Sequence, residues 1–502
     1  MSSILGNMVK QFCGDTHNAG LRVNHPLALR VLAALLSKPL LIATGLSGSG
    51  KTKLVQAIAR WLTPPAVPYD PFFVGASIAA DRIVYHVKKS DSLAIEFWND
   101  MDEEKAIKVV LPRELISEWV VYMATLPDPK NIPARSLREA VSSKSKFSPQ
   151  LHSFETQLKA AGMAVLNSKT AETKLACHAV IPVGADWTGN ENIFGYPDGL
   201  DAKVYVLKPA LELMLHAKSM PDIPHFMILD EMNLSHVERY FSDVLSALES
   251  EEIIPLYQGG ERKSNELAIP CGIHLPKNLF IIGTVNVDET TYMFSPKVLD
   301  RANVIEFRLE TQDLEAFLKQ PIKPNLARLD GGGAKFGAHF QAATLETQAL
   351  SFSGNSLFHN ELVNFFTALQ GHGLEFGYRV AHEAARFAHF YQLLTNPING
   401  DSTWVTSALD CIVFQKFLPK LHGSRAKLGP LLKTLWFLCV NDKAKRGANP
   451  LAAADQAARS SDKKGEPSRT VPPDAPYPLS AEKIGRMWRL LLDNGFTSFA
   501  EA

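Results

Sequence analysis

The sequence predicts an α/β fold, with a parallel sheet in its first part and helices in its last part. An apolar run at 39–45 is followed by a glycine-rich turn and an amphipathic helix, which is how a parallel α/β sheet opens. Three later apolar runs each end in polar residues, as central strands of such a sheet do. After about residue 310 the strand signals fade and helical spacing dominates.

The first 65 residues are expected to form a linker and the start of the sheet. Residues 28–37 have helical apolar spacing, and PLLIATG at 39–45 is typical of a short buried strand. KTKLVQAIARWL at 51–62 predicts an amphipathic helix. That helix should end at Thr63, because the following proline pair cannot continue the hydrogen-bond ladder.

Residues 66–175 differ in pattern and are interpreted as an inserted small α+β domain. RIVYHVKKSDSLAIEFW alternates apolar and polar residues, which predicts a half-exposed hairpin. LPRELISEWVVYMATL predicts a helix, and the run VSSKSKFSPQ has the composition of a loop.

The sheet should resume over 176–310. HAVIPVG (178–184), HFMILDE (225–231) and NLFIIGTVN (278–286) are predicted to be central parallel strands, with chemistry at their carboxyl ends. Residues 311–502 then predict a helical lid domain, with a flexible break at 329–337 and an exposed loop at about 441–476. Ser480 is the expected N-cap of the last helix.

Composition limits the possible functions. Hydrophobic residues make up 46% of the chain, which argues against wholesale disorder, and the balance of 52 basic and 52 acidic residues excludes a global field that attracts DNA. The five cysteines are far apart, so we expect reduced thiols in a cytoplasmic protein, without a disulfide framework or a zinc site. The most apolar stretch, 31–43, is too short for a membrane span and contains Lys38.

The strongest motif is a complete phosphate-binding loop of the form G-x-x-x-x-G-K-[ST]. Its glycines allow backbone N–H groups to surround phosphates, and the next helix presents its positive end to them. Lys51 should reach the β and γ phosphates, and the Thr52 hydroxyl should bind Mg²⁺. The predicted loop consists of Gly45, Leu46, Ser47, Gly48, Ser49, Gly50, Lys51 and Thr52.

Two of the later strands end in side chains that fit the same chemistry. Asp230 can hold the Mg²⁺ shell, and Glu231 can orient or deprotonate the attacking water. Asn286 can hydrogen-bond the γ-phosphate or that water. Solvated acids at a strand end, or an asparagine that starts a turn, are the simpler alternatives.

Two arginines are candidate cations for the transferred phosphate. Arg301 lies at the end of a predicted helix, and in ring-forming nucleoside triphosphatases such an arginine reaches the neighbour's γ-phosphate. Arg379 opens a helix of the lid and could supply a second cation to the nucleotide. A surface Arg–Asp pair and an ordinary helix-terminal arginine are the alternatives.

These motifs, in this order, resemble AAA+ ATPases. The segment DWTGNENIFGY at 186–196 is similar to the D-W-T…G-Y segment of McrB-type proteins, the motor subunits of modification-dependent restriction systems. DEMNLS at 230–235, GTVNVDETTYMFSPKVLDRANVIEF and FGYRVAHEAARF extend the resemblance, which covers about two-thirds of the chain. In the family an acidic residue often follows the sensor asparagine, which corresponds to Asn286 here. In this chain that acid could be Asp288 or Glu289.

The resemblance implies a homo-oligomeric, hexamer-like ring that hydrolyses ATP or GTP with Mg²⁺ to move or remodel DNA in anti-phage defence. A separate McrC-like nuclease would cleave the DNA, because no nuclease motif is evident in this chain. DNA would be contacted through the partner or through 66–175. Family members contact the base near the linker, here around Val23 to His25.

Other functions use the same chemistry. A MoxR-like chaperone ATPase that remodels protein complexes is one alternative, and a nucleotide-dependent assembly switch is another. Trp187 and Tyr196 could stack on bases, although core packing explains them equally well. One cluster of basic residues could touch phosphates, but it is more simply explained as a solvated surface: Lys416, Lys420, His422, Arg425 and Lys427.

Overall fold

The computed structural model describes most of the chain outside the predicted insertion. Across these residues, no helix combines the length and apolar character needed to cross a bilayer. The described ranges are 2–64, 67–68, 77–80, 83–90, 94–98, 108–112, 174–264, 267–287, 292–309, 311–319, 321–346, 354–397, 401–441 and 466–502 without 469, with 451, 453, 454 and 456.

The centre of the molecule is a parallel sheet, as the sequence predicts. It has five strands in the order β17-β1-β16-β11-β8. Three interior strands carry continuous apolar runs, because both faces of the sheet are covered. The strands are β1 (Leu40–Gly45), β8 (His178–Pro182), β11 (His225–Asp230), β16 (Leu279–Asn286) and β17 (Asn303–Phe307).

One strand differs from its prediction. HAVIPVG was expected to form a central strand, but β8 pairs only with β11 and is an edge strand. Its residues are mostly half-buried or exposed, and Val180 is 38% exposed. An apolar run in the sequence therefore does not distinguish an edge strand from an interior strand. That distinction depends on whether the strand has a neighbour on one side or on both.

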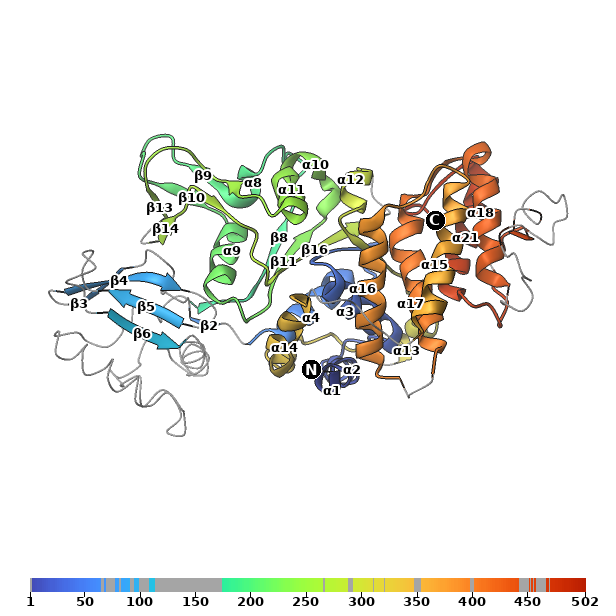
Figure 1. Ribbon diagram of the computed structural model, residues 1–502, viewed down its shortest axis with the longest axis horizontal. Helices are drawn as coiled ribbons and strands as arrows, with labels where there is room; N and C mark the ends of the chain where they lie inside the picture. The colour runs from blue at the N-terminus through green and yellow to red at the C-terminus, as the bar shows by residue number, and fades with distance from the viewer. Residues whose placement is uncertain are drawn as a thin grey trace.

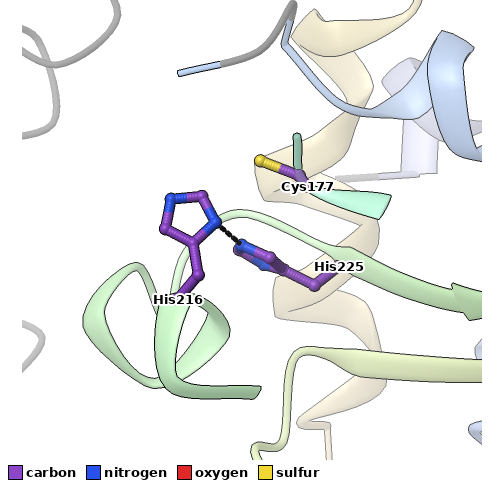
Figure 2. Close-up of side chains that lie close together, drawn as sticks. All are labelled: Cys177, His216 and His225. Atoms are coloured by element: carbon purple, nitrogen blue, oxygen red, sulfur yellow. Dashed lines mark hydrogen bonds between the residues drawn. The ribbon is translucent and has the colours of Figure 1, made fainter. Parts of the chain in front are cut away.

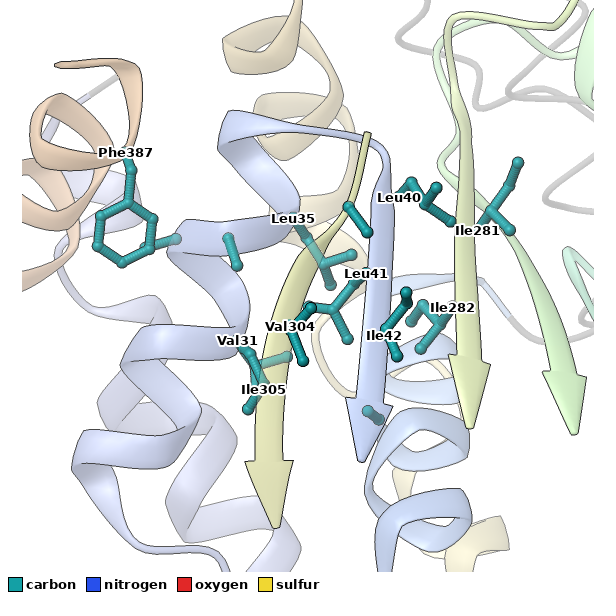
Figure 3. Close-up of a cluster of buried hydrophobic side chains, with 14 of the residues drawn as sticks. Val31, Leu35, Leu40, Leu41, Ile42, Ile281, Ile282, Val304, Ile305 and Phe387 are labelled. Carbon is teal, nitrogen blue, oxygen red and sulfur yellow. The ribbon is translucent and has the colours of Figure 1, made fainter. Parts of the chain in front are cut away.

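The helices next to β1 explain its burial. Helix α3 (His25–Ser37) begins at Asn24, whose side chain accepts a hydrogen bond from the Leu27 N–H. Figure 3 shows Val31 and Leu35 of α3 beside β1 and β17, with Phe387 on the other side of α3. Helix α4 (Lys51–Leu62) ends before Thr63, as predicted, and covers the sheet near β11 and β16.

Two short hairpins project from the sheet region, at the upper left of Figure 1. One is β9 (Gly195–Pro197) with β10 (Tyr205–Leu207), and the other is β13 (Arg262–Ser264) with β14 (Leu267–Ile269). They are joined by a hydrogen bond of 2.7 Å from the Lys263 N–H to the Lys203 carbonyl. Two further short pairs are β12 (Ile254–Pro255) with β15 (Gly272–Ile273) and, in the C-terminal part, β18 (His422–Ser424) with β19 (Phe496–Ser498).

The predicted insertion is described only in its strands. The expected hairpin is present, since β4 (Ile83–Ser90) pairs antiparallel with β5 (Ala94–Trp98). β3 (Ser77–Ala80) and β6 (Lys108–Pro112) complete a four-stranded sheet. The helix expected at 111–126 does not begin where predicted, because residues 111 and 112 belong to β6. The rest of that helix and the Ser/Lys-rich loop lie outside the described residues, so the insertion as a separate domain stays a prediction.

The two ends of the predicted insertion pair with each other. β2 (Val67–Pro68) lies at its start and β7 (Lys174–Leu175) at its end, and the two strands are antiparallel. Between β8 and β11 lies α9 (Pro209–Ser219), and α11 (Ser242–Ser250) and α12 (Pro296–Leu299) flank β16 in the sequence.

The C-terminal part is helical, as predicted, and its helices from residue 355 onward gather at the right of Figure 1. The expected exposed loop at 441–476 lies mainly outside the described residues. The helices are α13 (Thr311–Lys319), α14 (Ala334–Thr344), α15 (Asn355–Gln370), α16 (Tyr378–Thr395), α17 (Thr403–Ile412), α18 (Arg425–Val440) and α21 (Pro478–Asn494).

The glycines at 331–333 are a packed turn and not the flexible break that the sequence predicts. A Cβ atom on Gly333 would lie 2.4 Å from the Trp61 ring. The Gly333 N–H also donates to the Trp61 carbonyl at 2.8 Å. The glycines are needed here because the Trp61 ring lies against the backbone.

Ser480 is not the N-cap of the last helix. Helix α21 begins two residues earlier, at Pro478, and Ser480 is buried within its first turn. The carboxylate of Asp410, in α17, accepts hydrogen bonds of 2.8 Å from the N–H groups of Leu479 and Ser480. A side chain from another helix therefore caps α21, which local sequence signals cannot reveal.

Candidate nucleotide-binding site

The glycine-rich loop connects β1 to α4 at the carboxyl edge of the sheet. Gly45, Gly48 and Gly50 all have positive φ angles. A Cβ atom on Gly45 would lie 2.3 Å from the Phe307 carbonyl oxygen, so β17 leaves no room for a side chain there. The strand, turn and helix thus have the arrangement expected for a phosphate-binding loop.

Lys51 is 4% exposed and folds back onto its own loop. Its ammonium donates to the carbonyls of Gly45 at 2.8 Å and Leu46 at 2.6 Å, and lies 3.4 Å from the Ser49 hydroxyl. These acceptors hold the cation at the mouth of the loop. A phosphate bound by the loop would compete for the same ammonium.

The Asp230 carboxylate accepts hydrogen bonds from two threonine hydroxyl groups. One of its carboxylate oxygens, Oδ1, accepts hydrogen bonds from Thr52 at 2.9 Å and from Thr284 at 2.6 Å. The Thr52 hydroxyl and the Asp230 carboxylate are the hard oxygen ligands that Mg²⁺ prefers. Both residues therefore fit a magnesium ion bound together with a nucleotide, as the sequence predicts.

Glu231 follows in a left-handed conformation, with φ of 56° and ψ of 48°. Such a conformation is unfavourable for a non-glycine residue by about 1 kcal/mol or more and is common at functional sites. Met232 stabilises the turn, because its side chain covers Gly283 so closely that a Cβ atom there would meet its sulfur at 2.2 Å. The turn directs the Glu231 carboxylate toward Asn286, whose amide donates to it at 3.3 Å.

Thr284 is a site residue that the sequence analysis missed. Its hydroxyl contacts Asp230 and also accepts a hydrogen bond of 3.1 Å from the Glu231 N–H. It is 2% exposed, in the interior strand β16. The available signal was a polar residue within the apolar run LFIIGTVN, two positions before Asn286.

Arg301 and Arg379 lie together at the opposite edge of the sheet. Both form ion pairs with Glu249, and Arg379 also approaches the Asp300 carboxylate at 3.8 Å. Arg301 precedes β17, whose first residue Asn303 pairs with Leu41, whereas the phosphate loop follows Gly45. Four residues of strand, or about 13 Å, separate the two edges.

Arg379 was predicted to serve the nucleotide from the lid, and it does not lie beside Lys51 of its own chain. It shares Glu249 with Arg301, so the structure places the two arginines in one cluster. The guanidinium of Arg301 also donates to the carbonyls of Leu245 at 2.9 Å and Lys297 at 2.8 Å. Burial and the neighbouring Arg379 charge lower the pKa of Arg301.

Two lysines hold the backbone on either side of Arg301. Lys38 donates to the Asp300 carbonyl at 3.0 Å, and Lys416 donates to the Ala302 carbonyl at 2.9 Å. Both ammonium groups form ion pairs with Glu383. Lys416 is only 3% exposed, so it does not belong to a solvated basic surface as expected from the sequence.

Burial has a large effect on this ionic cluster. Burial and the positive charge of Lys416 lower the pKa of Lys38 to about 7, although Glu383 opposes the shift. Burial also lowers the pKa of Lys416. Burial alone would raise the pKa of Glu383, but the two lysines lower it. The three charges therefore depend on one another.

The segment at 186–196 packs on the turn that follows Glu231. The Ser235 hydroxyl donates to the Trp187 carbonyl at 2.6 Å, and the Trp187 ring meets the Tyr240 ring edge-on at 5.4 Å. Tyr196 is 46% exposed on β9. Trp187 is thus part of the packing, and Tyr196 remains accessible.

The linker that the resemblance connects with the base borders a cavity. The cavity has a volume of about 510 Å³. Val23 and Asn24 lie in its wall, with Arg22 and, from α13, Asp313. Asp288 and Glu289, the two candidate acids after the sensor asparagine, lie outside the described residues.

Comparison with known proteins adds little about function. Residues 340–496 match the model of a family described as a domain of unknown function, DUF8727. Of the predicted site residues, that stretch contains only Arg379. No curated protein matches the sequence.

Among the solved structures that are similar at a low level is the crystal structure of a "putative ATPase" from Cytophaga hutchinsonii. The two proteins are 11% identical, and the similarity covers 83% of this chain and 88% of the other, with a TM-score of 0.38. The functional assignment therefore depends on the geometry of the site.

Proposed function

We propose that this protein is a Mg²⁺-dependent nucleoside triphosphatase that hydrolyses ATP or GTP. The observation that carries the proposal is the convergence of the Thr52 and Thr284 hydroxyls on one carboxylate oxygen of Asp230, at the end of the glycine-rich loop. Helix α4, strand β11 and strand β16, which are far apart in the sequence, supply these groups. A chance glycine turn would not bring a magnesium ligand set to the mouth of the loop.

Each residue then has a definite task in phosphoryl transfer. The loop N–H groups and Lys51 bind the phosphates, and Thr52 and Asp230 hold Mg²⁺, which neutralises charge on the phosphate oxygens. Glu231 orients the attacking water and accepts its proton, and the Asn286 amide, 3.3 Å from that carboxylate, fixes its direction. Thr284 positions both acids.

We further propose a ring of the McrB type, in which Arg301 and Arg379 complete the site of the neighbouring subunit. Support comes from the DWTGNENIFGY segment and from the place of the arginine cluster, at the edge of the sheet opposite its own phosphate loop. In this proposal a separate nuclease cleaves DNA, and nucleotide hydrolysis drives translocation or remodelling in defence against foreign DNA.

Glu231→Gln tests the catalytic assignment. Its amide preserves shape and hydrogen bonding but cannot accept a proton, so we expect hydrolysis to fall at least about 100-fold. Affinity for a fluorescent ATP or GTP analogue with Mg²⁺ should stay within about threefold. Lys51→Ala should instead abolish that binding. Equal turnover by wild type and Glu231→Gln would refute the role of Glu231.

The DNA role needs a separate experiment. Co-purification with the product of the adjacent gene, followed by a nuclease assay on modified and unmodified DNA with each nucleotide, distinguishes the candidates. Nucleotide-dependent cleavage supports the restriction motor. Remodelling of a protein partner without cleavage supports the MoxR-like alternative, and nucleotide-driven assembly with negligible turnover supports a switch.

A further inference from the structure

A buried cluster of one cysteine and two histidines lies at the amino edge of the sheet. Cys177 precedes β8, His216 belongs to α9 and His225 opens β11, and Figure 2 shows their side chains converging. Cys177 is 1% exposed and both histidines are 0% exposed. Asp230 lies at the other end of β11, about 17 Å away along the strand, so this cluster is separate from the nucleotide site.

The three side chains are close enough to share one ion. The cysteine sulfur and one nitrogen from each imidazole all lie within 4.8 Å of one another. His225 Nε2 and His216 Nδ1 are 3.1 Å apart. In a tetrahedral zinc site, with bonds of about 2.0 to 2.3 Å, ligand atoms lie about 3.4 to 3.6 Å apart. Small side-chain rotations would therefore produce that geometry.

The surroundings of His225 fix the nitrogen that a metal would need. Its Nδ1 lies 2.8 Å from the Ile223 carbonyl, which can only accept, so Nδ1 carries the proton and Nε2 presents its lone pair to the cluster. The Asn278 amide nitrogen lies 2.7 Å from the same carbonyl and 2.8 Å from the Met220 carbonyl, which holds this loop. A carbonyl that orients the ring of a ligating histidine is common at metal sites.

The protonation states also suit a cation. Burial lowers the pKa of His216 to about 4 and that of His225 well below its ordinary value, and the neutral form of imidazole is the one that binds metal. Burial raises the pKa of the Cys177 thiol to about 12. A divalent ion would offset the thiolate charge that burial otherwise disfavours.

We propose that Cys177, His216 and His225 bind one divalent transition-metal ion, with Zn²⁺ the best match to a sulfur and two imidazoles. Binding replaces the S–H bond of Cys177 with a sulfur–metal bond and releases that proton to solvent. In the same step the Nδ1 proton of His216 moves to Nε2. The metal keeps its oxidation state.

The proposed role is structural, because the ligands are buried and come from three neighbouring elements. Cys177 lies two residues after β7, which pairs with β2. A metal here would fasten β8, β11 and α9 where the chain rejoins the sheet. Sequence spacing argued against a zinc site because the ligands are separated along the chain and meet only in the fold.

The test uses the untagged, full-length protein after removal of metal with a chelator. Titration with Co²⁺ should bind one ion per chain and produce the near-ultraviolet absorption of a cobalt–thiolate bond, which Zn²⁺ then displaces. Co²⁺ at the oxygen ligands Thr52 and Asp230 would lack this absorption, so the result is independent of the nucleotide site. Zn²⁺ should also raise the Tm by several degrees.

The variants identify the ligands. Cys177→Ser should remove the thiolate absorption, and His216→Asn or His225→Asn should weaken Co²⁺ binding about 100-fold. Cys439→Ser, at another buried cysteine, and His178→Asn, at a histidine next to Cys177 and outside the cluster, should bind Co²⁺ like wild type.

A measurement on the wild type covers variants that fail to fold. Zn²⁺ should protect Cys177 from alkylation in mild denaturant, measured by mass spectrometry, while exposed Cys271 reacts equally with and without the metal. The proposal is overturned if saturating Co²⁺ gives no thiolate absorption, if Cys177→Ser keeps it, or if Zn²⁺ does not slow alkylation of Cys177.

Discussion

The Thr52 hydroxyl donates a hydrogen bond of 2.9 Å to the Asp230 carboxylate, although 178 residues separate the two in the sequence. The strand order makes this contact possible. β16 lies between β1 and β11, so Thr284 reaches the same carboxylate oxygen from the middle strand. The two residues proposed to hold Mg²⁺ therefore come from α4, which follows β1, and from the end of β11, and Thr284 of β16 contacts Asp230 from the strand between them.

Thr284→Val should reduce catalysis more than binding. Valine keeps the shape and burial of threonine, but it removes the hydroxyl that contacts Asp230 and the Glu231 N–H. Loss of a hydrogen bond to a charged group costs about 1.5 to 3 kcal/mol, so we expect kcat to fall by roughly 10- to 150-fold. Steady-state kinetics and nucleotide titration measure the two effects separately.

Thr434→Val is the matched control for that substitution. Thr434 is also 2% exposed but belongs to α18 in the lid, where its hydroxyl contacts a backbone carbonyl. Its kcat should stay within about twofold of wild type, because no part of the site depends on it. A Thr284→Val enzyme that turns over at the wild-type rate would show that the hydroxyl bridge is dispensable.

Mixing two inactive variants should restore activity if Arg301 acts across subunits. A Lys51→Ala subunit cannot bind nucleotide but still presents Arg301, and an Arg301→Ala subunit has the reverse defect. In randomly mixed rings roughly a quarter of the interfaces combine an intact loop with an intact arginine. We expect a corresponding fraction of wild-type turnover, measured after mixing under conditions that allow subunit exchange.

Arg379→Ala should behave like Arg301→Ala in the same assay, since both arginines bind Glu249. Each parent variant assayed alone sets the background. Mixtures that are no more active than the sum of their parents would place the arginines in the site of their own chain, contrary to the proposal.

Lys416→Met should destabilise the protein and impair catalysis at a distance. Methionine keeps much of the side-chain length but leaves Glu383 with one lysine and removes the donor to the Ala302 carbonyl. Removing one partner from a buried ion pair costs about 3 to 5 kcal/mol. Denaturant unfolding should show this loss, and kcat should fall with little change in nucleotide affinity because the backbone at Arg301 is released.

Lys420→Met provides the comparison. Lys420 is 25% exposed and pairs with the Asp300 carboxylate, so its loss should cost no more than about 1 kcal/mol. If the two lysine variants lose equal stability, the buried position of Lys416 has no special importance.

Glu306→Gln should change how the free energy of unfolding depends on pH in the acidic range. Burial alone would raise the pKa of Glu306, but hydrogen bonds from Arg486 and the charge of Lys483 lower it from 4.5 to about 2. A lowered carboxyl pKa stabilises the fold above pH 4.5, and this contribution disappears as the pH falls toward 2. It amounts to roughly 3 kcal/mol at neutral pH.

Unfolding of both proteins in denaturant at pH 7 and at pH 3 checks this expectation. Wild type should exceed Glu306→Gln at pH 7, and the difference should shrink at pH 3. Glu482→Gln is the control, since Glu482 is 48% exposed and pairs with Arg308 nearby. A difference that is independent of pH would contradict the lowered pKa.

The sequence predicted much of the fold and most of the candidate site. Strand β1, helix α4 and strands β11 and β16 were found because local apolar runs, a glycine turn and a proline stop have direct physical meanings. Asp230, Glu231 and Asn286 could be placed at one edge because parallel strands end together. Thr284 was missed, since a threonine inside a strand is ordinary and only its two contacts distinguish it.

The errors share one cause, which is dependence on distant partners. Asp410 caps a helix that begins 68 residues later, and Trp61 packs on Gly333. Lys416 is buried because it forms an ion pair with Glu383. No local pattern carries such information. Cys177, His216 and His225 are a further case, because their spacing in the sequence does not suggest a cluster.

Strand β17 is bound to the C-terminal helical part at both of its ends. At its start the Ala302 carbonyl accepts from Lys416, and at its finish Glu306 pairs with Lys483 and Arg486 of α21. Its neighbour β1 leads into the phosphate loop. The sheet and the C-terminal helices of one chain should then turn as a single rigid body. In the proposed ring, a nucleotide-driven movement would therefore change the contact between adjacent subunits and not a hinge inside each one.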